Sequence, residues 1–233
     1  MLLLFDIDGT LVQGASKEHA RALMQALHNV HGVSTNTISQ HGSAAGRTDG
    51  EIARLILLDA GVSAERIDER ADDVEAECCR LYTTMCPPDL SQMVVDGIPQ
   101  TLEWLGGLED VQLALLTGNF EPVARVKLRA AGIGHWFPHQ QGGFGSDSED
   151  RSMLPPIARR RAGTGAGLGI SWPREGTVVI GDTPRDIACA HADGVRCVAV
   201  TSGPHGEDDL AAADAVARSS AELRAELAVL LGV

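Results

Sequence analysis

The sequence predicts an α/β protein in which a parallel sheet carries an inserted helical domain. The apolar run at residues 2–5 has the length and composition of a buried strand in a parallel sheet. Residues 14–90 show helical periodicity with no strand signal, whereas strand and helix patterns alternate from residue 97 onward. We therefore expect a core made of residues 1–13 and 91–233, interrupted by a helical insert at residues 14–90.

Helices are expected throughout the insert. The first spans about residues 17–30, with Ser16 as a plausible N-cap. The second spans about residues 49–60, and the third spans about residues 64–85 and stops before Pro87-Pro88. These patterns leave no segment of the insert for a strand.

The rest of the chain supplies the remaining strands and their crossover helices. Strands are expected at residues 111–116, 178–180 and 197–200, with a short edge strand at 215–216. Helices are expected at about residues 99–105, 121–131, 154–162, 184–192 and 220–231. Residues 132–150 show no periodicity and are expected to be irregular. This alternation is typical of a doubly wound sheet with helices on both faces.

Composition restricts the partners that the protein can bind. The 233 residues include 44% hydrophobic ones and carry a formal net charge of -13, which repels nucleic acid and anionic membranes. Five cysteines without a C-x-x-C pair suggest neither a disulfide framework nor a zinc site. No segment approaches the roughly 18 apolar residues of a membrane span. We expect a cytoplasmic protein with no nucleic-acid or membrane partner.

Two acidic residues directly follow the first strand. Because side chains alternate along a strand, Asp6 and Asp8 project from the same face. They lie at the edge where open α/β sheets bind ligands, outside the carboxyl ends of the strands. Gly9 permits a sharp turn that leaves free amides near both carboxylates. Two acids beside free amides suit a cation and a phosphate together.

Polar residues also end two later strands. Thr117-Gly118 follows one of them, and Gly181-Asp182 follows another, with Asp186 four residues on. The carboxyl ends of neighbouring strands lie about 5 Å apart, so these groups are expected to converge on Asp6 and Asp8. Converging carboxylates repel one another unless a hard cation such as Mg²⁺ lies between them.

The motifs together resemble those of a known superfamily. Asp6-Ile7-Asp8-Gly9-Thr10-Leu11, the strand ending in Thr117-Gly118-Asn119, and Gly181-Asp182 with Asp186 are similar to motifs I, II and IV of haloacid dehalogenase superfamily phosphatases. The resemblance covers essentially the whole chain, because the insert looks like that superfamily's C1-type helical cap. The most similar branch contains phosphoglycolate phosphatase and β-phosphoglucomutase. The resemblance implies a Rossmann-like core below a helical cap.

The resemblance also implies a role for each residue of the first two motifs. Asp6 would be the nucleophile that forms an aspartyl phosphate. Asp8 would be the general acid for the leaving alcohol and then the base that activates water. The Thr117 hydroxyl and the Gly118 amide would hold the phosphoryl oxygens, and Asn119 would be a further substrate-binding residue.

The implied cofactor is Mg²⁺. Its ligands would be Asp6, the backbone carbonyl of Asp8, and Asp182, with Asp186 as an additional or water-mediated ligand. Phosphoryl transfer depends mainly on in-line positioning and charge neutralisation, which such a site supplies.

One motif departs from the superfamily pattern, which usually has a lysine as motif III ahead of a helix. The two lysines of the chain are Lys17 and Lys127, and residues 149–156 contain none. Arg151 occupies the expected place and would supply the positive charge beside the phosphate and Asp6, with a planar fork in place of a point charge. Arg185 and Lys127 are the alternatives.

Arg47 lies in a loop between two insert helices that would face the site. An arginine there would bind a carboxylate or a second phosphate of the substrate bidentately. A surface arginine beside a helix N-cap explains the same residue. Both interpretations remain open from the sequence.

The function expected is that of a Mg²⁺-dependent phosphomonoester hydrolase, similar to phosphoglycolate phosphatase, acting on a small phosphorylated metabolite. One alternative is a phosphomutase of the same branch, which returns the phosphoryl group to a sugar. A second is a module that binds phosphorylated metabolites without turnover; the intact pair Asp6 and Asp8 argues against it, and the missing motif III lysine keeps it open. Dehalogenase chemistry is disfavoured because it leaves Asp8 without a task.

Overall fold

A six-stranded parallel sheet forms the centre of the protein. The computed structural model describes residues 1–34 and 44–233. All pairings between neighbouring strands are parallel. In spatial order the strands are β3 (Gly143–Phe144), β2 (Gln112–Thr117), β1 (Leu2–Phe5), β4 (Thr177–Gly181), β5 (Arg196–Val200) and β6 (Ala215–Ala217).

Strand β1 lies in the middle of this sheet, between β2 and β4. Leu2 is in register with Gln112 on one side and with Thr177 on the other. The chain therefore builds outward to β2 and β3 first and then returns to β4 on the opposite side of β1. Ligands of open α/β sheets bind where the strand order reverses in this way, outside the carboxyl ends of the strands.

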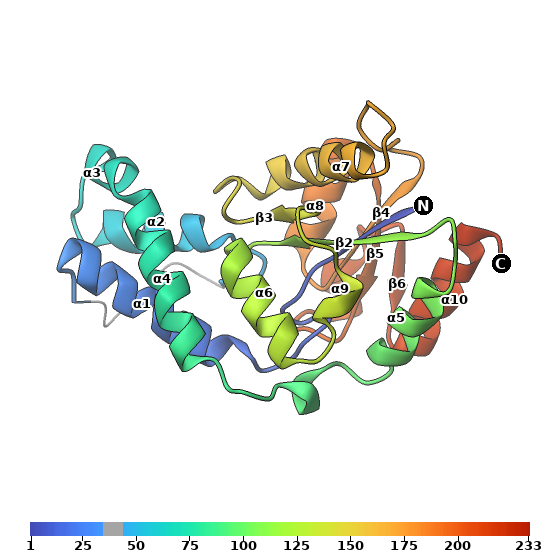
Figure 1. Cartoon of the computed structure of the whole chain (residues 1–233), viewed down its shortest axis with the longest axis horizontal. Coiled ribbons are helices and arrows are strands. Elements are labelled where there is room, and N and C mark those ends of the chain that lie inside the picture. The colour runs from blue at the N-terminus through green and yellow to red at the C-terminus, as the bar shows by residue number, and fades with distance from the viewer. Residues whose placement is uncertain (35–43) are drawn as a thin grey trace.

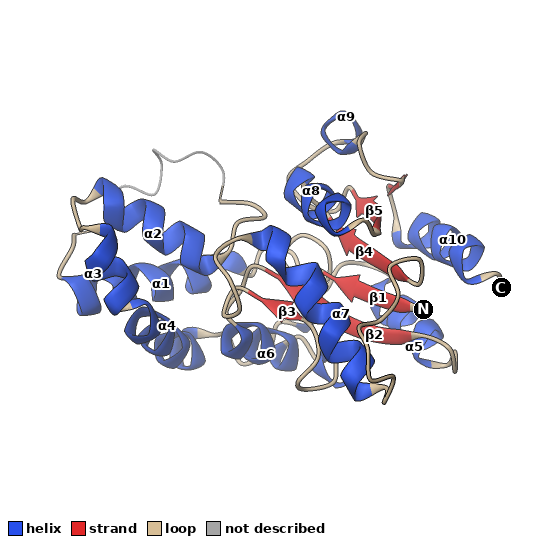
Figure 2. Cartoon of the chain, turned by 90° about the horizontal axis from the view of Figure 1, so that it is seen from above, coloured by secondary structure: helices blue, strands red, loops and turns tan. Residues whose placement is uncertain are grey.

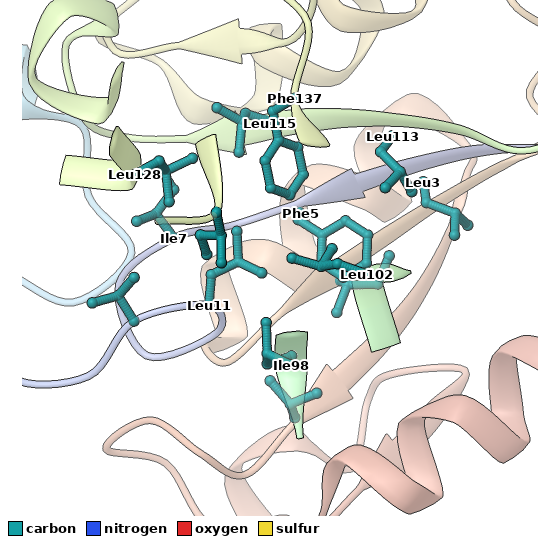
Figure 3. Close-up of a cluster of buried hydrophobic side chains, with 14 of the residues drawn as sticks. Leu3, Phe5, Ile7, Leu11, Ile98, Leu102, Leu113, Leu115, Leu128 and Phe137 are labelled. Carbon is teal, nitrogen blue, oxygen red and sulfur yellow. The ribbon is translucent and has the colours of Figure 1, made fainter. Parts of the chain in front are cut away.

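One face of the sheet is covered by α5 (Ile98–Gly106), α6 (Glu121–Ala130) and α10 (Ser220–Leu231). Leu3 and Phe5 of β1 point into this layer, and both are fully buried. Figure 3 shows them among the apolar side chains of the helices and of the neighbouring strand, including Leu102 of α5, Leu128 of α6 and Leu115 of β2.

The opposite face is covered by α7 (Leu154–Gly165), α8 (Pro184–Asp193) and the short α9 (Glu207–Leu210). Leu2 and Leu4, the other two residues of β1, point into this second layer. Burial of all four β1 side chains explains why the strand is a continuous apolar run. Helices on both faces confirm the doubly wound α/β fold.

The insert forms a separate bundle at one end of the sheet, on the left in Figures 1 and 2. Its helices are α1 (Ser16–His31), α2 (Asp49–Asp59), α3 (Ala64–Glu69) and α4 (Ala71–Met85). They share a hydrophobic core of their own, which Phe120 and Val123 join from the α6 region. The bundle thus packs against the amino-terminal end of α6. Among the described helices, none combines the length and apolarity that crossing a membrane requires.

Several local predictions were wrong. The long third helix is divided at Arg70, where φ is -119° and ψ is 10°. Arg70 is both the C-cap of α3 and the N-cap of α4. Ser16 is the first residue of α1 and not its N-cap; its hydroxyl donates to Asp8 Oδ1 at 3.2 Å. The stretch expected to be irregular contains β3, which is too short to produce a periodic pattern.

Short 3-10 turns complete the described part of the chain. They lie at Ser91–Met93, Gly134–Trp136 and Arg151–Met153. The last of these directly precedes α7 and carries one of the residues predicted for the site.

Candidate active site

The carboxyl ends of β1, β2 and β4 open into a cavity of about 600 Å³ between the sheet and the helical insert. Every residue predicted for the site except Asp186 lines this cavity, namely Asp6, Asp8, Arg47, Thr117, Gly118, Asn119, Arg151 and Asp182. Asp186 is fully buried behind it. The structure therefore brings together groups that lie up to 176 residues apart in the chain, at the sheet edge expected from the strand pattern.

Asp6 is the first residue beyond β1, and its backbone amide still donates to the Ile180 carbonyl of β4 at 2.9 Å. Only 5% of the residue is exposed. Burial raises the pKa of Asp6, the nearby carboxylates of Asp186 and Asp8 raise it further, and the Arg151 charge offsets only part of this. The carboxylate therefore needs more positive charge than the protein itself provides.

Asp182, at the end of β4, is the second acid of this cluster. Carboxylate oxygens of Asp6, Asp182 and Asp186 lie within 4.8 Å of one another. Asp182 Oδ1 accepts from the Thr10 hydroxyl at 3.0 Å, whereas its buried Oδ2 has no hydrogen-bond partner among the described residues. Burial, followed by the charges of Asp6 and Asp186, raises the pKa of Asp182. An unpartnered buried carboxylate oxygen beside other acids fits a hard divalent cation.

Two glycines make room for the Asp182 carboxylate. A Cβ atom at Gly9 would lie 2.2 Å from Asp182 Oδ2, and one at Gly203 would lie 1.7 Å from it. Gly9 also has a φ of +91°, which side-chain-bearing residues rarely adopt. The space around the unpartnered oxygen therefore exists because both neighbours lack side chains.

Asp186 has both of its carboxylate oxygens engaged by the protein. Oδ2 accepts from the backbone amide of Thr183 at 3.0 Å and from its hydroxyl at 2.7 Å, which forms a capping box at the start of α8. Oδ1 accepts from Arg151 Nη2. Asp186 thus caps a helix and anchors the arginine.

Arg151 extends from the 3-10 turn before α7 into the acid cluster and is only 7% exposed. Its Nη2 donates to Asp6 Oδ1 at 2.9 Å as well as to Asp186, and its Nη1 donates to the Gly46 carbonyl at 3.2 Å. The structure therefore places Arg151, and not Lys127 or Arg185, beside Asp6. Arg185 does not line the cavity.

Lys127 contacts the other acid of the first motif. Its Nζ donates to Asp8 Oδ1 at 2.8 Å, to Asp8 Oδ2 at 2.7 Å and to Asn119 Oδ1 at 2.8 Å. Burial alone would raise the pKa of Asp8, but the Lys127 charge and the hydrogen bonds of Lys127 and Asn119 outweigh it and leave the pKa below its ordinary value. The sequence signal for this contact is a lysine on the apolar face of α6, beside Val123, Ala124 and Leu128.

The loop after β2 brings backbone atoms to the cavity. Thr117 is buried, and its Oγ1 accepts from the Asn119 amide at 3.3 Å. The Asn119 side chain is directed at Asp8, because Nδ2 donates to Asp8 Oδ2 at 3.0 Å. A Cβ atom at Gly118 would lie 2.1 Å from the Arg47 carbonyl oxygen, so a glycine is required where this loop meets the insert.

Arg47 both lines the cavity and precedes a helix cap. Thr48 is the N-cap of α2 and accepts from the Glu51 amide at 3.1 Å. Arg47 Nη1 is paired with Glu51, while its buried Nε has no partner in the part of the chain that the structure describes. Arg47 is therefore not a surface arginine; it lies beside an N-cap and lines the cavity, and its binding of a substrate anion stays a prediction.

His19 of α1 also lines the cavity and was not identified from the sequence. Its Nε2 lies 3.0 Å from Asp49 Oδ2, which also accepts from the Phe120 amide at 2.7 Å. The available signal was a histidine one helical turn before Leu23, on the apolar face of α1. His19 and Asp49 link the insert to the start of α6.

The insert also contacts the segment that leads to Arg151. Glu149 accepts from Arg54 Nη2 at 2.9 Å through its side chain, and from the Thr48 hydroxyl at 2.7 Å through its backbone carbonyl. Nearby, the Ser146 hydroxyl donates to Glu75 Oε1 at 2.6 Å. Residues 146–149 therefore form the side of the core to which α2 and α4 attach.

Comparison with known proteins agrees with this geometry. A family model described as HAD-hydrolase-like matches residues 155–223. Phosphoglycolate phosphatase of Pseudomonas fluorescens is 29% identical over 204 residues, which cover 87% of this chain and 70% of that protein.

Solved structures share the fold at lower identity. A predicted phosphatase from Clostridium acetobutylicum has a TM-score of 0.68 at 19% identity, covering 100% of this chain and 98% of its own. A β-phosphoglucomutase from Clostridium difficile has a TM-score of 0.68 at 18% identity, covering 97% of this chain and 94% of its own. The chain therefore resembles phosphatases of the haloacid dehalogenase superfamily in sequence, and it shares their fold.

Proposed function

We propose that this phosphatase is a Mg²⁺-dependent phosphomonoester hydrolase that acts on a small phosphorylated metabolite through an aspartyl phosphate on Asp6. The observation that carries the proposal is the setting of Asp6. Its carboxylate contacts the buried Arg151 and lies in the cavity beside Asp182, whose Oδ2 has no partner among the described residues and remains for a cation. Phosphoryl transfer needs this combination of a nucleophile with concentrated positive charge.

In the first half of the reaction, an Asp6 oxygen attacks phosphorus and the ester P–O bond breaks. Arg151 holds Oδ1 of Asp6, which leaves the second oxygen for the attack. The Thr117 hydroxyl and the Gly118 amide bind phosphoryl oxygens, and Asp8 delivers a proton to the departing alkoxide.

In the second half, Asp8 removes a proton from a water molecule, and the resulting hydroxide displaces phosphate from Asp6. Asp8 begins this step ionised, because it gave up its proton in the first half, and it ends the step protonated again. The same residue therefore serves both halves, and the protons that it gives and takes balance over one turnover.

The donor set proposed for Mg²⁺ is Asp6, the backbone carbonyl of Asp8 and Asp182, with Asp186 acting indirectly through the contacts that it already makes. The unpartnered Oδ2 of Asp182 supports this assignment. Bound there, Mg²⁺ would offset the mutual repulsion of the acids and the charge on the phosphoryl oxygens.

We also propose that residues 14–90 act as a cap domain over a catalytic core of residues 1–13 and 91–233. The cap would exclude bulk water during transfer. Arg47, with a free Nε at the cavity wall, would bind an anionic group of the substrate such as a carboxylate. A cytoplasmic location is part of the proposal and is supported by the five unpaired cysteines.

A phosphomutase remains the second candidate, because a β-phosphoglucomutase shares the fold over nearly the whole chain. Product analysis on a sugar phosphate separates the two: a hydrolase releases inorganic phosphate, whereas a mutase yields an isomeric sugar phosphate. The third candidate, a module that binds phosphorylated metabolites without turnover, depended on the absence of a motif III lysine. Arg151 disfavours it, because this arginine supplies positive charge beside Asp6.

The test is phosphate release from p-nitrophenyl phosphate and a panel of phosphorylated metabolites. The wild-type protein should release phosphate with Mg²⁺ and stop on chelation, and Asp6→Asn should abolish turnover. Asp96→Asn, at an exposed acid that does not line the cavity, is the matched control and should remain active. Hydrolysis by Asp6→Asn at the wild-type rate would exclude Asp6 as the nucleophile, and a wild-type protein that binds but never turns over would support the binding module.

A further inference from the structure

We infer that Lys127, together with Asn119, is a positioning residue that holds the carboxylate of Asp8 in place for proton transfer. The inference rests on the proposed function, in which Asp8 is the general acid and base. It assigns a role to a lysine that lies outside all the motifs that predicted the site.

The contacts of Lys127 account for its whole ammonium group. Its three hydrogen bonds go to the two carboxylate oxygens of Asp8, at 2.8 and 2.7 Å, and to Asn119 Oδ1, at 2.8 Å. An ammonium group has three protons, so each of them has an acceptor. Lys127 therefore has no donor left for a substrate and acts through Asp8.

Burial makes a purely structural explanation of Lys127 weak. The residue is fully buried on the face of α6 that packs into the protein. Removing a charged pair from water costs as much as or more than the pair returns, and an apolar side chain of similar volume often serves stability equally well. A lysine at this position is better explained by the hydrogen bonds with which it holds both carboxylate oxygens of Asp8.

Asn119 completes a rigid setting for the Asp8 carboxylate. Its Nδ2 donates to Asp8 Oδ2 at 3.0 Å, and the Ser16 hydroxyl donates to Asp8 Oδ1 at 3.2 Å. With Lys127, four hydrogen bonds fix both oxygens, while the Asp8 side chain stays 27% exposed on the cavity side. A proton-transfer group must remain within hydrogen-bond reach of the reacting oxygen, and these contacts restrict its rotation.

The same contacts connect Asp8 to the loop that would hold the phosphoryl group. Asn119 directly follows Thr117-Gly118, and its backbone amide donates to Thr117 Oγ1 at 3.3 Å. The acid and base group and the phosphate-binding loop are thus parts of one hydrogen-bonded unit. Each acid of the first motif also has its own buried cation, Arg151 for Asp6 and Lys127 for Asp8.

The test measures kcat/KM of Lys127→Met for phosphate monoesters whose leaving groups range from 2,4-dinitrophenol to a simple alkanol. This ratio covers the steps up to formation of the aspartyl phosphate. Alkoxides need a proton to depart, whereas 2,4-dinitrophenolate does not. We expect kcat/KM for the alkyl ester to fall about 10²-fold or more, within the range that general acid catalysis supplies. The value of kcat/KM for the dinitrophenyl ester should fall far less.

The matched control is Lys17→Met, which removes the only other lysine of the chain from an exposed position on α1. It should leave kcat/KM unchanged for every ester.

A uniform loss for all esters, or no loss at all, would overturn the inference. If Lys127→Met does not fold, Asn119→Ala provides the second variant, because it keeps the ion pair between Lys127 and Asp8. Asn119→Ala should shift the dependence of kcat/KM on the leaving group in the same direction, by a smaller amount. An unchanged dependence would again overturn the inference. A wild-type protein without Mg²⁺-dependent hydrolysis would instead contradict the proposed function itself.

Discussion

Arg151 Nη2 donates to Asp6 Oδ1 at 2.9 Å, and both side chains are only 7% exposed. The same nitrogen donates to Asp186, so one guanidinium joins two buried carboxylates, one just after β1 and one in the first turn of α8. A group in this position neutralises charge at the proposed nucleophile and holds one of its oxygens. An arginine presents a planar fork to these carboxylates, whereas a lysine would present a point charge.

Replacing Arg151 tests this arrangement. Arg151→Met leaves two buried carboxylates without their cation and should cost about 3–5 kcal/mol of the free energy of unfolding, as breaking a buried ion pair does. Turnover should be lost, and Arg151→Lys should restore part of it because an ammonium supplies the charge without the fork. Steady-state kinetics and denaturant unfolding measure the two effects.

The control for this pair is Arg160→Met, on the exposed side of α7, which should match the wild type in both measurements. Full activity of Arg151→Met would show that the charge beside Asp6 is dispensable.

Adding and removing Mg²⁺ should change the thermal stability of the protein. A ligand at 100 times its dissociation constant stabilises the folded state by about 2.7 kcal/mol. For a chain of this size that corresponds to a rise in Tm of roughly 5–10 °C. Asp182→Asn should abolish most of the rise, because it replaces the carboxylate whose Oδ2 is free. An equal rise in this variant would place the cation elsewhere.

Glu75 should make the stability of the protein depend on pH. Burial raises the pKa of Glu75, the Ser146 hydrogen bond offsets part of this, and neighbouring acids add to it. The folded state therefore keeps the proton to a higher pH than the unfolded chain does. The resulting stabilisation is complete below the unfolded pKa and is lost as the pH rises through the folded pKa.

Glu75→Gln removes this dependence, so its stability relative to the wild type should increase as the pH rises from about 4 to 7. Urea unfolding at several pH values measures the difference. Glu69→Gln, at an exposed acid of α3, is the control and should show little effect. A difference that is constant with pH would contradict the predicted titration.

Much of the fold could be predicted because its elements are long and periodic. The β1 run is apolar at every position because both faces of the strand are covered, and α10 has the same bounds in the sequence pattern and in the structure. Shorter features could not be predicted. β3 consists of Gly143–Phe144 and exists through its pairing with Leu116 and Thr117, which no local pattern encodes. The division at Arg70 likewise has no glycine or proline to mark it.

The residues at the strand ends could be predicted to meet because a parallel sheet aligns its carboxyl ends at one edge. Asp6, Thr117 and Asp182 are of this kind. Lys127 and His19 are not, because they reach the cavity region from helix faces, and their direction depends on how each helix packs. In both cases a polar residue at an apolar helical position was the available signal.

Glu149 joins the helical insert to the segment of the core that carries the cation beside Asp6. Arg54 and Thr48 of the insert donate hydrogen bonds to Glu149, which lies two residues before Arg151 in the chain. Only Asp150 separates Glu149 from Arg151 in the chain, and Arg151 contacts Asp6. The same short backbone segment therefore fixes both the attachment of α2 to the core and the position of the guanidinium beside Asp6.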